Sequence, residues 1–102
     1  MKKKTIIERQ GAKIDEFTAV FEGKEYKYKI QEPTFEQLSA ALSVSIGFRN
    51  KLDMSGAGKT IFELCCMEYS PEIETNSKLL ISICVNLYTE YVLPVEVEIK
   101  KN

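Results

Sequence analysis

The sequence predicts a small single domain of the α+β class, spanning residues 1–102. Three observations predict it: two alternating apolar segments joined by a glycine turn, a proline followed at once by a helix cap, and two later apolar series with helical spacing. A chain of 102 residues that is 44% hydrophobic can bury one modest core. We expect an N-terminal antiparallel β-hairpin, then a three-helix bundle, then a short C-terminal strand, at about 17–30, 34–46, 54–69, 75–93 and 95–100.

The hairpin is predicted by the alternation between Phe17 and Ile30. A two-residue turn at Gly23-Lys24 would place Phe21 opposite Tyr26. The apolar side chains that then share one face are Phe17, Ala19, Phe21, Tyr26, Tyr28 and Ile30. A slip of one residue would mix the two faces, so we expect this face to lie against the core.

The first helix is expected to begin directly after Pro33. Proline disfavours the helical conformation at the residue before it, and Thr34 with Gln37 forms a capping-box sequence. The residues that follow with the spacing of one helical face are Leu38, Ala41, Leu42, Ser45 and Ile46. Gly47 is the expected end of this helix.

The second helix is expected to start at a cap provided by Asp53 or Ser55. Its apolar series runs through Ile61, Leu64, Cys65 and Tyr69. The third helix, from about Thr75 to Leu93, is the longest and most apolar, and Pro94 is its expected end.

Two strands outside the hairpin are also predicted. Val95, Val97 and Ile99 alternate with charged residues, which favours a short strand that could add to the hairpin. The segment from Thr5 to Glu8 is a weaker candidate for a strand at the N-terminus.

Composition excludes several classes of partner. Fourteen basic and fifteen acidic residues leave a formal charge of −1, so no overall field attracts nucleic acid. The longest mostly apolar segment, Leu79 to Leu93, is shorter than the roughly 20 residues that span a bilayer. Lys2, Lys3 and Lys4 are followed only by Ile6 and Ile7, too short an apolar run for a signal peptide. A soluble protein with no membrane partner is expected.

The segment Gly56-Ala57-Gly58-Lys59-Thr60 resembles the end of a phosphate-binding loop. The full pattern G-x-x-x-x-G-K-[ST] requires a glycine where this chain has Asp53, and a buried strand before the loop, which Phe48 to Leu52 does not predict. We interpret the segment as a loop that leads into a helix.

Metal and acid–base sites are equally unsupported. The chain has no histidine, and its cysteines, Cys65, Cys66 and Cys84, contain no C-x-x-C pair. Three cysteines cannot all pair within one chain, which favours a reducing cytoplasm. Cys65 and Cys84 lie within apolar helical series, so core packing is expected for both. The candidate acids, Glu63, Glu68, Glu72 and Glu74, are not marked out by spacing. No catalytic residue, metal or cofactor is predicted.

The third helix carries a second apolar stripe. Its main face already contains six apolar residues, and Ile81, Val85 and Val92 lie beside that face. Either the helix is central and buried on most sides, or this stripe, with exposed aromatic area around Tyr88 and Tyr91, binds a partner helix or another copy. The candidate partner-binding residues are Ile81, Val85, Tyr88 and Val92.

Three segments carry a family resemblance: FEGKEYKYKIQEPTFEQLSAAL, GAGKTIFELCCME and SPEIETNSKLLISICVNLY. The chain resembles, over roughly Phe17 to Tyr91, the tail assembly chaperones of tailed bacteriophages. In that family a short hairpin with a G-K-x-Y type segment precedes a P-T-x-E/Q helix start and a small helical bundle. These shared motifs are folding features and include no catalytic group.

The resemblance implies a non-catalytic assembly factor in the host bacterial cytoplasm. Such a protein holds the long, aggregation-prone tape measure protein soluble, helps tail subunits assemble around it and is absent from the finished virion. A homo-oligomer is compatible with this role. The alternative is a small structural or auxiliary virion protein that stays in the particle, docked by its hairpin edge or C-terminal strand.

Overall fold

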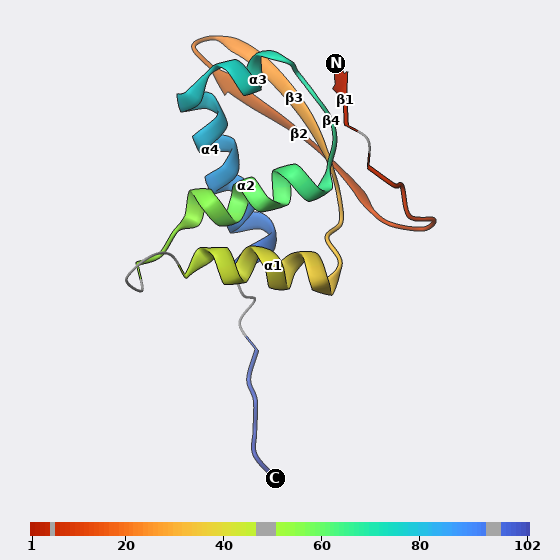
Figure 1. The fold of residues 1–102 in the computed structure, drawn as a ribbon, viewed down its shortest axis with the longest axis vertical. Helices are drawn as coiled ribbons and strands as arrows, with labels where there is room; N and C mark the ends of the chain where they lie inside the picture. Colours follow the sequence, from red (N-terminus) through yellow and green to blue (C-terminus); the bar gives the residue numbers. More distant parts are fainter. Residues whose placement is uncertain (5, 47–50, 94–96) are drawn as a thin grey trace.

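The computed structural model describes residues 1–4, 6–46, 51–93 and 97–102. It is a small, compact single domain of the α+β class, with a four-stranded antiparallel sheet and four helices (Figure 1). The strands are β1 (Lys2–Lys3), β2 (Ile14–Phe21), β3 (Lys24–Gln31) and β4 (Cys66–Tyr69), and the helices are α1 (Phe35–Ser45), α2 (Met54–Cys65), α3 (Glu72–Thr75) and α4 (Ser77–Leu87). The order of strands in the sheet is β1-β4-β3-β2.

The hairpin forms with the predicted faces but not with the predicted register. The turn is Glu22-Gly23 rather than Gly23-Lys24, and Tyr26 pairs with Ala19 instead of Phe21. Both turn residues have positive φ, 50° at Glu22 and 78° at Gly23, as a type I′ turn requires. Glycine fits the second of these positions without a steric penalty. Because the error is two residues, every side chain keeps its face.

The segment after α2 is a strand, not the end of a helix. The predicted helix at 54–69 ends at Cys65, and Cys66–Tyr69 forms β4 between β3 and β1. Tyr69 pairs with Tyr28, and a bulge lets Cys66 pair with Ile30. Residues 61, 65 and 69 share a helical face, but the unfilled edge of β3 gains backbone hydrogen bonds only if the chain extends.

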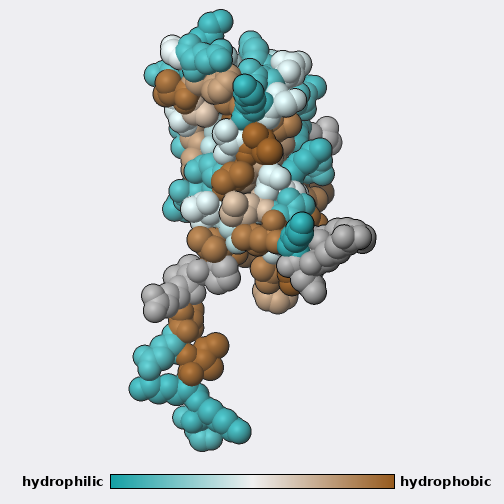
Figure 2. Space-filling view, turned by 90° about the vertical axis from the view of Figure 1, so that its left-hand side faces the viewer, coloured by the Kyte–Doolittle hydropathy of each residue, from teal (hydrophilic) through white to brown (hydrophobic). Residues whose placement is uncertain are grey.

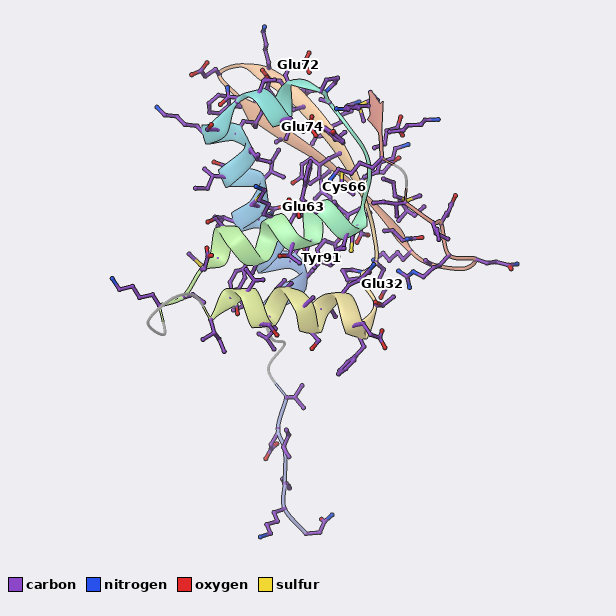
Figure 3. All side chains as sticks on the ribbon, viewed as in Figure 1. Glu32, Glu63, Cys66, Glu72, Glu74 and Tyr91 are labelled. Atoms are coloured by element: carbon purple, nitrogen blue, oxygen red, sulfur yellow. The ribbon has the colours of Figure 1, made fainter. Side chains whose placement is uncertain are left out.

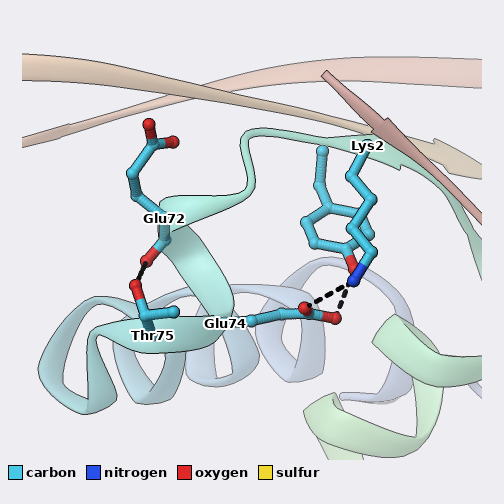
Figure 4. Close-up of polar contacts among 5 residues, drawn as sticks. Lys2, Glu72, Glu74 and Thr75 are labelled. Carbon is cyan, nitrogen blue, oxygen red and sulfur yellow. Dashed lines mark hydrogen bonds and ion pairs between the residues drawn. The ribbon is translucent and has the colours of Figure 1, made fainter.

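The N-terminus also joins the sheet, through Lys2–Lys3 rather than through the predicted Thr5 to Glu8. Thr5 lies outside the described residues, and 6–8 are not in a strand. The Lys2 Nζ lies 3.1 Å from Glu74 Oε2, while the Thr75 hydroxyl donates to the Glu72 carbonyl at 3.1 Å (Figure 4). The Lys2–Glu74 contact attaches β1 to α3 at the surface, and the Thr75–Glu72 bond is internal to α3.

The first two long helices begin at the predicted caps. Thr34 and Gln37 form both bonds of the capping box, at 2.9 and 3.2 Å. Of the two candidate caps for α2, Asp53 is the one used, because its Oδ1 accepts the Gly56 amide at 2.8 Å. Helix α1 ends at Ser45, and the predicted stop Gly47 lies outside the described residues.

The third predicted helix, 75–93, forms as α4 and a π-helical turn, and a short helix that was not predicted, α3, precedes it. α3 ends at Thr75, and Asn76 caps α4 by accepting the Leu79 amide at 3.1 Å. An asparagine side chain that binds a backbone amide replaces a helical hydrogen bond, which accounts for the break. The turn at Tyr88–Val92 then continues α4 as a π-helix. The expected terminator Pro94 lies outside the described residues.

The predicted C-terminal strand at 95–100 is not formed where it is described. Residues 97–102 are in no strand, and Val97 and Ile99 are 70% and 88% exposed. Val95 lies outside the described residues. In Figure 1 the final segment lies below α1, apart from the sheet. A strand with one apolar face needs a partner edge to bury that face, and within the described residues this segment pairs with no strand.

The core lies between the helices and one face of the sheet. Helix α2 packs between α1 and α4 and touches β3 and β4. Tyr28, Ile30 and Tyr69 contribute from the sheet, and the main helical contributions are Ile61, Phe62, Leu79, Ile83 and Leu87. The other face of the sheet is polar, with Lys29 Nζ between Glu16 and Glu68 at 3.3 and 3.4 Å. Among the described residues, no helix is long and apolar enough to cross a membrane.

Candidate functional site

The interpretation of Gly56 to Thr60 as a loop that leads into a helix is wrong, because the segment lies inside α2. Residues 56–60 belong to α2, so their backbone amides are not arranged as a loop around an anion. Gly58 is buried against α4, where a Cβ atom would overlap the backbone carbonyl of Cys84. Lys59 is exposed and lies 4.0 Å from Glu63, one helical turn later. The glycine is therefore explained by close packing of two helices.

The three cysteines are buried and free. Core packing, predicted for Cys65 and Cys84, is confirmed, and Cys66 is buried as well. Burial raises the pKa of all three thiols from 9.0 to about 11. A thiol with a raised pKa and no access to solvent is a poor nucleophile.

These thiols predict a loss of stability at alkaline pH. The unfolded chain loses thiol protons near pH 9.0 and the folded chain only near pH 11, so the folded state binds more protons between these values and stability falls as pH rises. Cys84→Ala should remove about a third of the cysteine contribution to that slope. Denaturant unfolding between pH 9.0 and 10.0 measures the difference. Above pH 10.0, the ordinary pKa of tyrosine, Tyr28 would lower stability as well, because burial raises its pKa to about 12.

When the slopes of stability against pH are compared between wild type and Cys84→Ala, the contributions of all other titrating groups cancel. Burial lowers the pKa of Lys4, which acts with the opposite sign in both of them. Identical slopes for the wild type and Cys84→Ala would contradict the burial of the Cys84 thiol.

The candidate acids do not converge on one site. Glu63, Glu72 and Glu74 come from α2 and α3 and are labelled at separate places in Figure 3. Glu68 pairs with Lys29 on the outer face of the sheet. The pKa of Glu74 is held below its ordinary value, first by the hydrogen bond from the Tyr69 hydroxyl and second by the hydrogen bond from Lys2. Such a shift is expected for a carboxylate with hydrogen-bond donors at the surface. Within the described parts of the chain, no group of three histidine, cysteine or acidic residues could hold a metal ion.

The four predicted partner-binding residues do not form one surface. Ile81 is 53% exposed and Val85 is partly buried, whereas Tyr88 and Val92 are both 7% exposed and belong to the core. The buried pair follows from the π-helical turn, which packs against α1 and α2. The expectation of exposed aromatic area at Tyr88 is wrong. Of the four residues, Ile81 is the one that is exposed at the surface.

Ile81 lines a shallow pocket between the start of α2 and α4. Its volume is about 260 Å³, and its lining includes Leu80, Cys84 and Lys59. This is below the roughly 300 Å³ at which small-molecule sites begin. The pocket can accept one or two side chains of a partner.

A second apolar surface lies on α1. Phe35, Leu42 and Ile46 are 80%, 48% and 66% exposed, and they follow one another at the spacing of one side of a helix. Leu52, 63% exposed, forms an antiparallel bridge with Ile46 and extends the surface. We call these four residues the α1 strip. In Figure 2, apolar area gathers at the lower end of the body, at the level of α1.

The sequence contained a signal for this surface. Leu42 and Ile46 fall on nearly the same helical face as the buried Ala41 and Ser45, so the spacing alone predicts the same burial for all four. The buried residues occupy only one side of that face, and Phe35 extends the exposed side by two turns. Glu36 is the only charged residue between Phe35 and Ser45, which is unusual for a helix at the surface.

Comparisons with protein-family models, with curated protein sequences and with solved structures gave no match. The fold and surface define a small α+β domain with an uncharged, apolar helical strip.

Proposed function

We propose that this protein is a non-catalytic assembly factor that binds an amphipathic helix of a partner through the α1 strip. The partner is the tape measure protein, as in the phage tail assembly chaperones that the sequence resembles. The work is done in the host bacterial cytoplasm before tail subunits enclose the client. The exposure of Phe35, Leu42 and Ile46 on one side of a nearly uncharged helix supports the proposal most.

The dimensions of the strip suit a helical client. From Phe35 to Ile46 it is about 16 Å long, the length of three turns of a partner helix. Anchors at the i, i+4 and i+7 positions of an amphipathic helix would meet residues with matching spacing. Burying a large apolar side chain contributes about 1.5–3 kcal/mol, so three such residues can hold a client without a charged contact. A client masked in this way is kept from aggregating.

Co-expression tests the proposal. The tape measure protein encoded in the same genome is expected to move from the insoluble to the soluble fraction when this protein is present, and to purify with it. Phe35→Ser/Leu42→Ser should lose most of this effect, because both residues are exposed and their loss removes binding area without opening the core.

A matched control lies on the same helix. Glu36→Ser/Ala40→Ser changes two exposed positions on the other side of α1 and should keep the client soluble. If both double variants work as well as wild type, the strip is not the binding surface. If mass spectrometry finds the chain in purified particles in stoichiometric amounts, the chaperone function is wrong and the chain is a virion component.

A further inference from the structure

We propose that residues 97–102 of one copy add as an antiparallel strand to the free edge of β2 in a second copy, so that the protein self-associates by strand exchange. The surface is distinct from the α1 strip and does not depend on the proposed client. Three features of the chain support it: an open sheet edge, an uncharged groove beside that edge, and an alternating segment with no surface of its own.

The edge of β2 is open over its whole length. β2 pairs with β3 on one side, and within the described residues no strand lies on its other side. Lys27 lies opposite Thr18. Its amide donates to the Ser70 hydroxyl and its carbonyl accepts from the Ser70 amide, both on the side of β4. In an antiparallel pair, the amides and carbonyls of two opposed residues either bond to each other or both point away from each other. Those of Lys27 point away from β2, so the Thr18 amide and carbonyl point away from β3, toward the open edge. Glu16 and Val20, two residues away, share this orientation.

A groove runs beside this edge, between β2 and α4. Its volume is about 340 Å³, and its lining includes Phe17, Ala19, Phe21, Leu79, Ser82 and Ile83. None of the residues that line it carries a charge. A strand added to β2 would direct every second side chain into this groove and the others toward solvent.

Residues 97–102 have the matching pattern. Val97 and Ile99 are 70% and 88% exposed, and they alternate with Glu98 and Lys100. With Ile99 beside Phe17 and Val97 beside Ala19, both apolar side chains enter the groove. Lys100 then lies beside Glu16. The Glu16 side chain is 72% exposed and already forms an ion pair with a lysine of β3. Opposite charges at neighbouring positions of a sheet stabilise that pairing.

The occupant is a second copy because of the direction of the chain. Tyr91 donates to Asp15 at 2.6 Å, so the chain leaves the core beside the start of β2. A segment that continues directly from there along β2 runs parallel to it, whereas the register with Lys100 beside Glu16 is antiparallel. In Figure 1 the segment also lies on the far side of α1 from the sheet. A strand from another copy can approach from the Phe21 end.

Two blocked variants test the exchange. Thr18→Pro removes the outward amide of the edge, and proline is tolerated where an edge amide faces solvent. Val97→Ser/Ile99→Ser removes the apolar face of the segment and alters no contact of the folded body. By light scattering after size exclusion, wild type should show at least twice the mass of one chain at high concentration, and each variant alone should show the mass of one chain.

Mixing the two variants is the sharpest measurement. The Thr18→Pro chain retains a competent segment and the Val97→Ser/Ile99→Ser chain retains a competent edge, so an equimolar mixture should form a one-to-one complex. Glu98→Ser/Lys100→Ser keeps the apolar face and should self-associate, with weaker binding from the loss of Lys100. Circular dichroism tests whether Thr18→Pro is folded. If Thr18→Pro does not fold, the comparison of wild type with Val97→Ser/Ile99→Ser tests the proposal.

A wild type that stays monomeric at all concentrations overturns the proposal. So does a segment variant that self-associates as wild type does, which would place the interface elsewhere. Loss of self-association in Phe35→Ser/Leu42→Ser, with no effect of the segment variant, would assign the contact to the α1 strip. Failure of the client experiment leaves these outcomes unchanged, because neither blocked variant alters α1.

Discussion

Replacing Gly58 by alanine is expected to lower the free energy of unfolding by about 2 kcal/mol. Alanine favours an isolated helix by about 1 kcal/mol over glycine, so propensity alone predicts the opposite sign. The added Cβ would overlap the Cys84 carbonyl, which belongs to the backbone of α4 and has no rotamer to adopt. Helices α2 and α4 would have to separate, and this opens the centre of the core. Urea denaturation of both proteins measures the change.

The neighbouring lysine is the control. Lys59→Ala changes an exposed position on the same helix and should alter stability by less than about 0.5 kcal/mol. A Gly58→Ala protein as stable as wild type would contradict the close contact of α2 with α4. A nucleotide-dependent thermal shift lost in Lys59→Ala would contradict the structural explanation of this segment.

Val92→Asp is expected to cost about 4 kcal/mol or more, which is a large part of the 5–15 kcal/mol that stabilises a domain of this size. Val92 is 7% exposed and packs in the core, so the new carboxylate would be buried with no partner provided for it. The cost should be smaller at acid pH, where the carboxyl group can take up a proton. Thermal and urea unfolding measure both effects.

The same substitution at Ile81 is the matched control. Ile81 is 53% exposed on α4, so Ile81→Asp leaves the carboxylate in water and should keep the fold. If both variants are as stable as wild type, the end of the π-helical turn is outside the core. Comparable loss in both would instead place Ile81 in a buried contact.

Local signals in the sequence were sufficient where one residue or one short pattern decides the structure. The capping box at Thr34 and Gln37 and the faces of the hairpin depend on neighbours in the chain, and both formed as predicted. The exact turn did not, because the preference of glycine for the second position of a type I′ turn shifted the pairing by two residues. The α+β class followed from these local elements.

Long-range pairing limited the rest. Cys66–Tyr69 became a strand because β3 had an unfilled edge, and that edge is visible only once the chain has folded. The exposure of the candidate partner-binding residues depends on long-range packing as well. Apolar residues on α4 and on the π-helical turn are indistinguishable in the sequence, yet Tyr88 and Val92 are buried and Ile81 is exposed. Burial depends on which side of a helix its neighbours cover, and spacing does not specify this.

We propose that the α1 strip binds an amphipathic helix of the client. Titration calorimetry with peptides that cover the amphipathic helices of the tape measure protein tests it most directly. We expect at least one peptide to bind wild type, and Phe35→Ser/Leu42→Ser to bind it at least about tenfold more weakly, a change of about 1.4 kcal/mol. Ile81→Asp should bind it as wild type does. Equal affinity of the strip variant and wild type for that peptide, with weaker binding by Ile81→Asp, would contradict the claim and move the site to α4.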